Sequence, residues 1–189
     1  GKLLDVGCNG GFFLSELGVD FDRFGTELDP SAVDFAKQNY PEFGENIYEG
    51  DIEQPTFEKE SFDAITMRGV IEHVSDPNKT LINVSKLLKK GGYFYICATP
   101  NGESFSADLY REKWTLFHPV QHLWHFSPNN LETLCSEYDL NLVWKDFQYL
   151  ETPYADPKED VQKVARKILD EEDKEISPPF FENMMSLIF

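Results

Sequence analysis

Short apolar strands and amphipathic helices alternate along almost the whole chain, and this alternation limits the fold more than any other feature. Strand patterns are predicted at residues 2–6, 24–28, 47–50, 62–68, 93–99, 142–149 and 184–189. Later helices start with a capping side chain and a proline, at Asp29-Pro30, Asp76-Pro77, Ser127-Pro128 and Asp156-Pro157. Such alternation favours an α/β fold, a doubly wound sheet with helices on both faces. We therefore expect residues 1–189 to form one domain.

Four further structural features are expected after residue 76. Gly91-Gly92 is expected to end the helix that starts after Asp76, and Leu131, Leu134 and Tyr138 share one face of the next helix. Residues 102–126 show little periodicity, and a loop of that length is often functional, so we expect a substrate or lid loop there. An acidic helix at 157–174, with Val161, Val164 and Ile168 as its apolar stripe, is expected between two antiparallel last strands.

Charge and cysteine content narrow the class of protein. A formal net charge of −17 argues against nucleic acid as a partner, because nucleic-acid affinity rests largely on Lys and Arg. Three cysteines without a Cys-x-x-Cys pair indicate a reduced, cytoplasmic protein. No membrane span and no secretory signal are expected. Since a strand pattern starts at Lys2 without an initiator Met, we expect a missing N-terminal segment; the oligomeric state is open.

Glycines and acids gather where the first three predicted strands end, which is where open α/β sheets bind ligands. The glycines at 7, 10 and 11 let a backbone approach a ligand closely, although their spacing is not that of a dinucleotide fingerprint. Glu27 lies 22 residues after Asp5, where a carboxylate can accept hydrogen bonds from both ribose hydroxyls. Asp51 could accept one from an exocyclic amine, with Ile52 as an apolar neighbour for a flat ring.

Taken together, these segments resemble the class I S-adenosylmethionine-dependent methyltransferases. The resemblance covers roughly residues 2–150 and keeps the family's order: residues 5–11, 25–30, 50–52, 62–65, 71–74 and 87–92. It implies a Rossmann-like, seven-stranded sheet of order 3-2-1-4-5-7-6 with the last strand antiparallel. It also implies S-adenosylmethionine as cofactor, with S-adenosylhomocysteine as product.

The resemblance also implies which residues bind the cofactor. They are Asp5, Gly7, Asn9, Gly11, Glu27, Leu28, Asp51, Ile52 and Arg68. In the family, Asp5 and Gly7 would lie under the methionine moiety, Leu28 would pack on adenine, and Arg68 would lie near the amino-acid end. Asn9 stands where the family usually has glycine, and Asn is among the residues that best tolerate a left-handed backbone.

Three later segments are similar to the small-molecule branch of this superfamily, which includes the ubiquinone-biosynthesis O-methyltransferases. They are Glu72-His73-Val74, Thr99-Pro100-Asn101 and residues 122–128. No Asn-Pro-Pro-Tyr or Asp-Pro-Pro-Tyr follows the strand at 62–68, which argues against methylation of nucleobase or glutamine amide nitrogens. The expected acceptor is therefore a small molecule, with oxygen as the favoured nucleophile.

Two histidines are the predicted catalytic residues. Methyl transfer from a sulfonium is an in-line displacement in which the protein chiefly aligns the reactants, and a general base helps when the nucleophile is a hydroxyl. Histidine suits this task near pH 7. His73 follows the strand at 62–68, and His122 lies in the aromatic segment before Ser127, whose Tyr110, Trp114, Phe117 and Trp124 could form the lid.

Other readings stay open. Some relatives hold a divalent ion between two acids and two histidines, and Glu72, His73 and His122 match three of those ligands. Gly69 stands where the fourth, an acid, would lie, so no metal ligand is assigned. The metal-assisted alternative would act on a quinone precursor or an RNA 3′ end. A non-catalytic cofactor-binding module is the third hypothesis, and a nicotinamide-dependent dehydrogenase is disfavoured by the glycine spacing.

Overall fold

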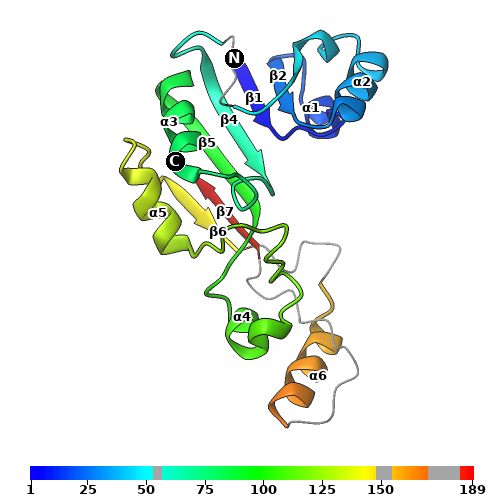
Figure 1. Ribbon diagram of the computed structural model, residues 1–189, viewed down its shortest axis with the longest axis vertical. Helices are drawn as coiled ribbons and strands as arrows, with labels where there is room; N and C mark the ends of the chain where they lie inside the picture. The colour runs from blue at the N-terminus through cyan, green and yellow to red at the C-terminus, as the bar shows by residue number, and fades with distance from the viewer. Residues whose placement is uncertain (53–56, 148–154, 170–183) are drawn as a thin grey trace.

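Seven strands form one sheet in the order β3-β2-β1-β4-β5-β7-β6 (Figure 1). The strands are β1 (Lys2–Val6), β2 (Asp22–Glu27), β3 (Ile47–Glu49), β4 (Phe62–Arg68), β5 (Leu88–Pro100), β6 (Trp144–Asp146) and β7 (Met184–Ile188). The first five run parallel, and β7 pairs antiparallel with both β5 and β6. This computed structural model describes residues 1–52, 57–147, 155–169 and 184–189. The predicted fold class and strand order are confirmed.

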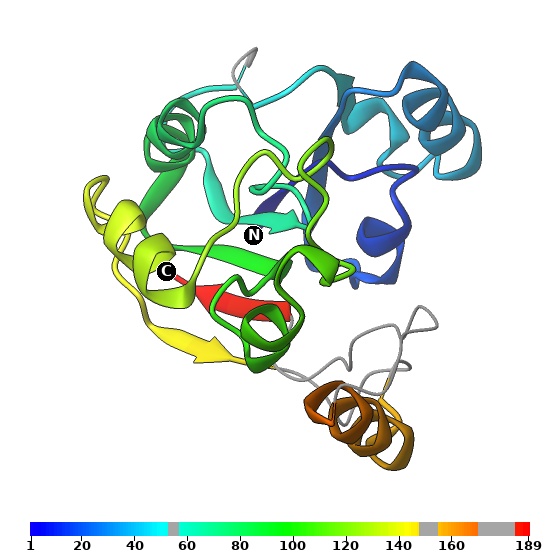
Figure 2. The ribbon, with the colours of Figure 1, turned by 60° about the horizontal axis from the view of Figure 1, so that its bottom comes forward.

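Among the described helices, α2 (Pro30–Asn39), α3 (Pro77–Leu87), α5 (Pro128–Ser136) and α6 (Pro157–Ile168) begin at the predicted capping signals. The others are α1 (Phe12–Glu16) and α4 (Phe105–Tyr110), with 3-10 turns η1 (Gly44–Asn46) and η2 (Arg111–Lys113). Asp29, Asp76, Ser127 and Asp156 each accept a hydrogen bond from a backbone N–H of the helix that they precede. The helices α1 and α2 lie beside β1 and β2, whereas α3 and α5 lie at the other side of the sheet (Figure 2).

The sheet separates two groups of buried apolar side chains. The larger contains Leu4, Ile65, Phe94 and Leu131 and lies on the side of α3 and α5. The smaller contains Leu3, Leu14 and Val33 on the side of α1 and α2. Because Leu3 and Leu4 alternate between the two groups, β1 is buried on both faces, as expected of a central parallel strand. This packing on both faces fixes the carboxyl end of β1, from which the next turn starts.

Two glycines behave differently from the prediction. Gly91-Gly92 does not end α3, because the helix stops at Leu87 and Leu88 is already extended. Both glycines lie inside β5, where the pairing with β4 shifts register between Leu88 and Tyr93. Gly91 has φ +76°, and a Cβ on Gly92 would lie 2.9 Å from the Asp63 carbonyl oxygen. The prediction of a helix end at this pair is wrong, because a helix end and a strand irregularity both favour glycine.

The region 102–126 is only partly a loop. Ser104 accepts a hydrogen bond from the Ala107 N–H and starts α4, and η2 follows it. The helix α5 ends at Ser136, so Tyr138 lies beyond it. The antiparallel pairing of β6 with β7 is as predicted, although β6 is described only as Trp144–Asp146 and residues 148–149 lie outside the described residues.

The helix α6 starts at Pro157, as predicted, and is described up to Ile168. The predicted residues 170–174 lie outside the described part of the chain. Val161 and Ile168 of its apolar stripe are exposed, and the helix lies outside the layers of sheet and helices, beyond α4 (Figures 1 and 2). Within the described residues, no helix is both long and apolar enough to cross a membrane.

Candidate functional site

The turn after β1 contains residues with positive φ, a backbone conformation that glycine and asparagine tolerate best. Gly7 has φ +70°, and its N–H donates to the Thr26 carbonyl oxygen at 2.8 Å. A Cβ on Gly7 would lie 2.6 Å from Cγ2 of Val70, in the turn after β4. Asn9 has φ +49°, the left-handed conformation, and its side-chain oxygen accepts the Gly10 N–H at 2.6 Å. Asn9 therefore takes the glycine-like backbone that the family pattern requires.

The Glu27 carboxylate is fixed at the end of β2 by three backbone N–H groups. The Asn9 N–H donates to Oε2 at 2.8 Å, and the N–H groups of Leu28 and Asp29 donate to Oε1 at 2.7 and 3.0 Å. A carboxylate can accept about four hydrogen bonds, so about one lone-pair site stays available. One side chain thus joins the β1 turn to the end of β2 and presents a fixed negative charge at the sheet edge.

A cavity of about 430 Å³ opens at this edge. Five of the predicted cofactor residues line it: Gly7, Glu27, Leu28, Asp51 and Ile52. Leu28 is 70% exposed, whereas Ile52 is buried, so the two offer apolar surface at the rim and at the wall. The Thr26 hydroxyl in the wall is buried and has no hydrogen-bond partner among the described residues. Acidic and apolar side chains are therefore presented together, which fits a nucleoside such as that of S-adenosylmethionine.

Asp5 lies directly under the turn rather than in the cavity wall. Its carboxylate is buried and accepts a hydrogen bond from the Thr66 hydroxyl at 2.5 Å. Burial raises the pKa of this carboxyl from 3.8 to about 6, although the Thr66 hydrogen bond and the Arg68 charge oppose the rise. The Asp5 carboxylate thus joins β1 to β4 just before the turn and holds its proton more tightly than an exposed aspartate does.

Gly11 and Arg68 lie outside the cavity lining. Gly11, with φ +80°, starts α1, and a Cβ there would lie 3.1 Å from the Phe43 ring. The Arg68 guanidinium lies over the Phe13 ring, 4.4 Å from its centroid, at the carboxyl end of β4. Their predicted roles in cofactor binding stay predictions.

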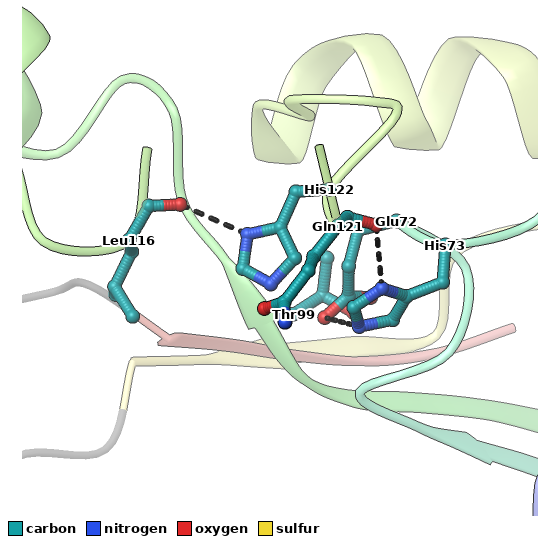
Figure 3. Close-up of polar contacts among 6 residues, drawn as sticks. All are labelled: Glu72, His73, Thr99, Leu116, Gln121 and His122. Atoms are coloured by element: carbon teal, nitrogen blue, oxygen red, sulfur yellow. Dashed lines mark hydrogen bonds and ion pairs between the residues drawn. The ribbon is translucent and has the colours of Figure 1, made fainter. Parts of the chain in front are cut away.

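The side chains of the two predicted catalytic histidines lie close together (Figure 3), although only His73 lines the cavity. His73 lines the cavity, and its ring centroid lies 4.8 Å from that of His122. Glu72 is buried behind them, where the Thr99 hydroxyl donates to its Oε2 at 3.0 Å and His73 Nε2 lies 3.9 Å from Oε1. One ligand atom each of Glu72, His73 and His122 lies within 4.8 Å of the other two.

Backbone carbonyl groups fix the orientation and tautomer of both rings. His73 Nδ1 donates to the Gln121 carbonyl oxygen at 2.8 Å, and His122 Nδ1 donates to that of Leu116 at 2.9 Å. In the neutral rings each Nε2 then carries a lone pair. Burial lowers the pKa of His122, so its neutral form dominates near pH 7, while burial raises the pKa of Glu72. The neutral His122 ring, with its Nε2 lone pair, can accept a proton or hold a metal ion.

Sequence reasoning missed several residues of this site. Thr26, Gly69, Val70, Ser75 and Thr80 also line the cavity. Gly69 and Val70 directly follow β4, so the rule that ligands bind at strand ends could have found them. Thr80 lies inside α3 and carries no local signal.

These features define a methyltransferase of the Rossmann-like class, and comparison with known proteins agrees. The chain belongs to a family described as a methyltransferase domain, whose sequence profile matches residues 1–145. The predicted methyltransferase class is thereby confirmed.

Named relatives are similar over part of their length. The ubiquinone biosynthesis O-methyltransferase of Coxiella burnetii is 38% identical over 112 residues, which is 57% of this chain and 47% of that protein. The protein of the same name from Cereibacter sphaeroides (strain ATCC 17029 / ATH 2.4.9) is 32% identical over 125 residues, 61% of this chain and 48% of that protein. The chain thus spans about half the length of the curated relatives that it matches.

Solved structures share the fold. A chain of the complex of the Haloferax volcanii Trm112 methyltransferase activator has a TM-score of 0.75 at 16% identity, covering 99% of this chain and 80% of that one. The YcgJ protein of Bacillus subtilis has a TM-score of 0.65 at 21% identity, covering 99% and 89%. At such identities these structures support the fold and nothing finer.

Proposed function

We propose that this chain transfers a methyl group from S-adenosylmethionine to an oxygen atom of a small-molecule acceptor. The observation that carries the proposal is the position of His73, which lines the same cavity as Gly7 and Glu27 while its ring contacts His122. The named relatives are O-methyltransferases, which favours the same chemistry. The net charge of −17 supports a small molecule over nucleic acid.

In this proposal each group has a separate task. When bound, S-adenosylmethionine supplies a methyl group that is already activated as a sulfonium. Glu27 binds the ribose, Leu28 and Ile52 hold the adenine ring, and Asp51 accepts a hydrogen bond from its amino group. His122 accepts the acceptor's hydroxyl proton at Nε2, because Leu116 holds its Nδ1–H. His73 is the second candidate for that base. Residues 102–126 would cover the acceptor as a lid.

Calorimetric titration tests the cofactor half of the proposal. S-adenosylmethionine and S-adenosylhomocysteine are titrated into the unmodified chain, into Glu27→Ala and into Glu49→Ala. Glu49 is an exposed carboxylate that pairs in register with Glu27 but does not line the cavity, so it is a matched control. We expect binding that is weakened in Glu27→Ala alone. Equal affinity in all three would refute the assignment of Glu27.

A panel of phenols, catechols and small alcohols tests the catalytic half. Turnover that falls by about 10²–10⁴ in His122→Ala, with unchanged S-adenosylhomocysteine affinity, would support a general base. Cofactor binding without turnover on any acceptor would favour a non-catalytic cofactor-binding module.

A metal-assisted O-methyltransferase is a second candidate, and a specific observation favours it. Both Nδ1–H groups donate to carbonyl oxygens, which is the usual arrangement of metal-binding histidines, and a buried carboxylate lies beside them. Glu72, His73 and His122 would hold the ion, which would polarise the acceptor oxygen. Gly69 offers no carboxylate, so two histidines and one acid fit Zn²⁺ better than Mg²⁺. Activity that is lost on chelation and restored by one divalent ion would distinguish this candidate from a metal-free base.

A further inference from the structure

The segment from Trp114 to His125 carries His122 without any helix or strand to support it. Within the segment, the backbone N–H of His122 donates to the His118 carbonyl oxygen at 2.7 Å and its ring is held by Leu116. At the far end, the Phe126 carbonyl oxygen accepts the Gly102 N–H at 2.7 Å. The position of His122 relative to His73 therefore depends on the contacts between this segment and the turn at residues 72–74.

Three described hydrogen bonds make that contact, and Trp124 contributes two of them. Its backbone N–H donates to the Glu72 carbonyl oxygen at 3.1 Å, and its indole Nε1–H donates to the Val74 carbonyl oxygen at 2.9 Å. The third is the bond from His73 Nδ1 to the Gln121 carbonyl oxygen. The acceptors of Trp124 thus lie directly before and directly after His73, on the turn that carries it.

The other contacts of the Trp124 indole do not depend on its N–H group. The indole does not line the cavity, it is 42% exposed, and its ring stacks near Phe126 with centroids 6.5 Å apart. Packing on Phe126 could be provided by any flat ring. Tryptophan adds to such a ring an N–H donor, which phenylalanine lacks. The geometry therefore uses the one feature that distinguishes tryptophan from phenylalanine.

We propose that Trp124 is a positioning residue that holds the segment of His122 against the turn of His73. This inference rests on the proposed function, because it matters for catalysis only if His73 or His122 acts there. Without the indole bond, the segment would keep its anchor at Phe126 but lose one of its three bonds to the turn. The two histidine rings would then separate for part of the time. Displacement of a catalytic group by about 1 Å can lower turnover by about 100-fold.

The test removes the donor while keeping the ring. Benzothienylalanine at position 124 has the shape of tryptophan but carries sulfur in place of the N–H, and Trp124→Phe is the simpler variant. Trp144→Phe is the matched control, since Trp144 lies on the edge strand β6 and is 43% exposed. Three quantities are measured: S-adenosylhomocysteine affinity, the nuclear Overhauser effect between the rings of His73 and His122, and kcat and KM with 3,4-dihydroxybenzoate or the best acceptor of the panel.

We expect both Trp124 variants to keep their affinity for S-adenosylhomocysteine, to weaken the ring-to-ring signal and to lower kcat by about 10-fold to 100-fold. Trp144→Phe should change none of these. An unchanged ring-to-ring signal in the benzothienylalanine protein would overturn the positioning role, even if His122→Ala were inactive. A weakened signal in a protein without turnover on any acceptor would support the positioning role and refute the proposed function instead.

Discussion

Replacing Gly7 by alanine should destabilise the chain by about 2–5 kcal/mol, and the structure supplies both contributions. The backbone has φ +70°, a conformation that costs an L-residue roughly 1–2 kcal/mol. The new Cβ would lie 2.6 Å from Val70 Cγ2, and overpacking of that kind costs about 1–3 kcal/mol. For a domain of this size, each kcal/mol lowers Tm by about 2–4 °C, so we expect a loss of about 4–20 °C.

Urea denaturation and S-adenosylmethionine calorimetry measure the two consequences. Gly7 and Val70 both line the cavity. If Val70 moves to make room for the new Cβ, the cavity changes shape, so cofactor binding should also weaken. Gly18→Ala is the control, because nothing lies within 4 Å of a Cβ at Gly18. We expect that variant to stay within about 0.5 kcal/mol of the unmodified protein.

A double-mutant cycle separates the two contributions. Val70→Ala removes the Cγ2 atom that the new Cβ would meet but leaves the backbone strain of position 7 in place. The cost of Gly7→Ala should therefore fall by about 1–3 kcal/mol in a Val70→Ala background. If Gly7→Ala matched Gly18→Ala in both stability and cofactor affinity, the conformation of this turn as described would be wrong.

Three further predictions concern titration and hydrogen bonding. Asp5 has a folded-state pKa of about 6 against 3.8, so the folded form binds its proton more tightly and stability is lost as pH rises from about 4 to 7. Asp5→Asn should abolish this loss of about 2–3 kcal/mol in urea titrations at several pH values, and a slope equal to that of the unmodified protein would contradict it. Thr99→Val leaves the buried Glu72 carboxylate without its hydroxyl donor and should cost about 1–3 kcal/mol by thermal denaturation, whereas the exposed Thr133→Val should cost less. Because burial lowers the pKa of His122, base catalysis should persist below pH 6.5 and fall at more acidic pH; a kcat profile that falls at or above pH 6.5 would exclude this base.

Local signals were sufficient for most of the fold. Asp29, Asp76 and Ser127 start helices because a side-chain acceptor before the first turn is a purely local cause, visible in sequence. Gly91-Gly92 was assigned wrongly because the same residues serve a helix end and an irregular strand, and only pairing with β4 decides between them. The exposure of Val161 and Ile168 on α6 was likewise invisible, since amphipathic spacing does not say whether anything covers the apolar side.

The candidate site likewise contains residues that the sequence predicts and contacts that it does not. Glu27, Asp51 and Gly7 could be found because strand ends converge on one edge of a parallel sheet. The contact of His73 with His122 joins positions 49 residues apart through carbonyl groups of Gln121 and Leu116. Because every residue has a backbone carbonyl group, these hydrogen bonds cannot be predicted from residue types.

The position of β7 sets the order in which the sheet can be completed. Residues 184–188 pair with both β5 and β6, so β6 reaches the sheet only through a strand that follows it by nearly 40 residues. During synthesis on the ribosome, β5 would present an open edge where Met185 and Leu187 later become fully buried. A nascent chain that halts before residue 184 would therefore expose an unpaired edge strand, which is a surface prone to aggregation.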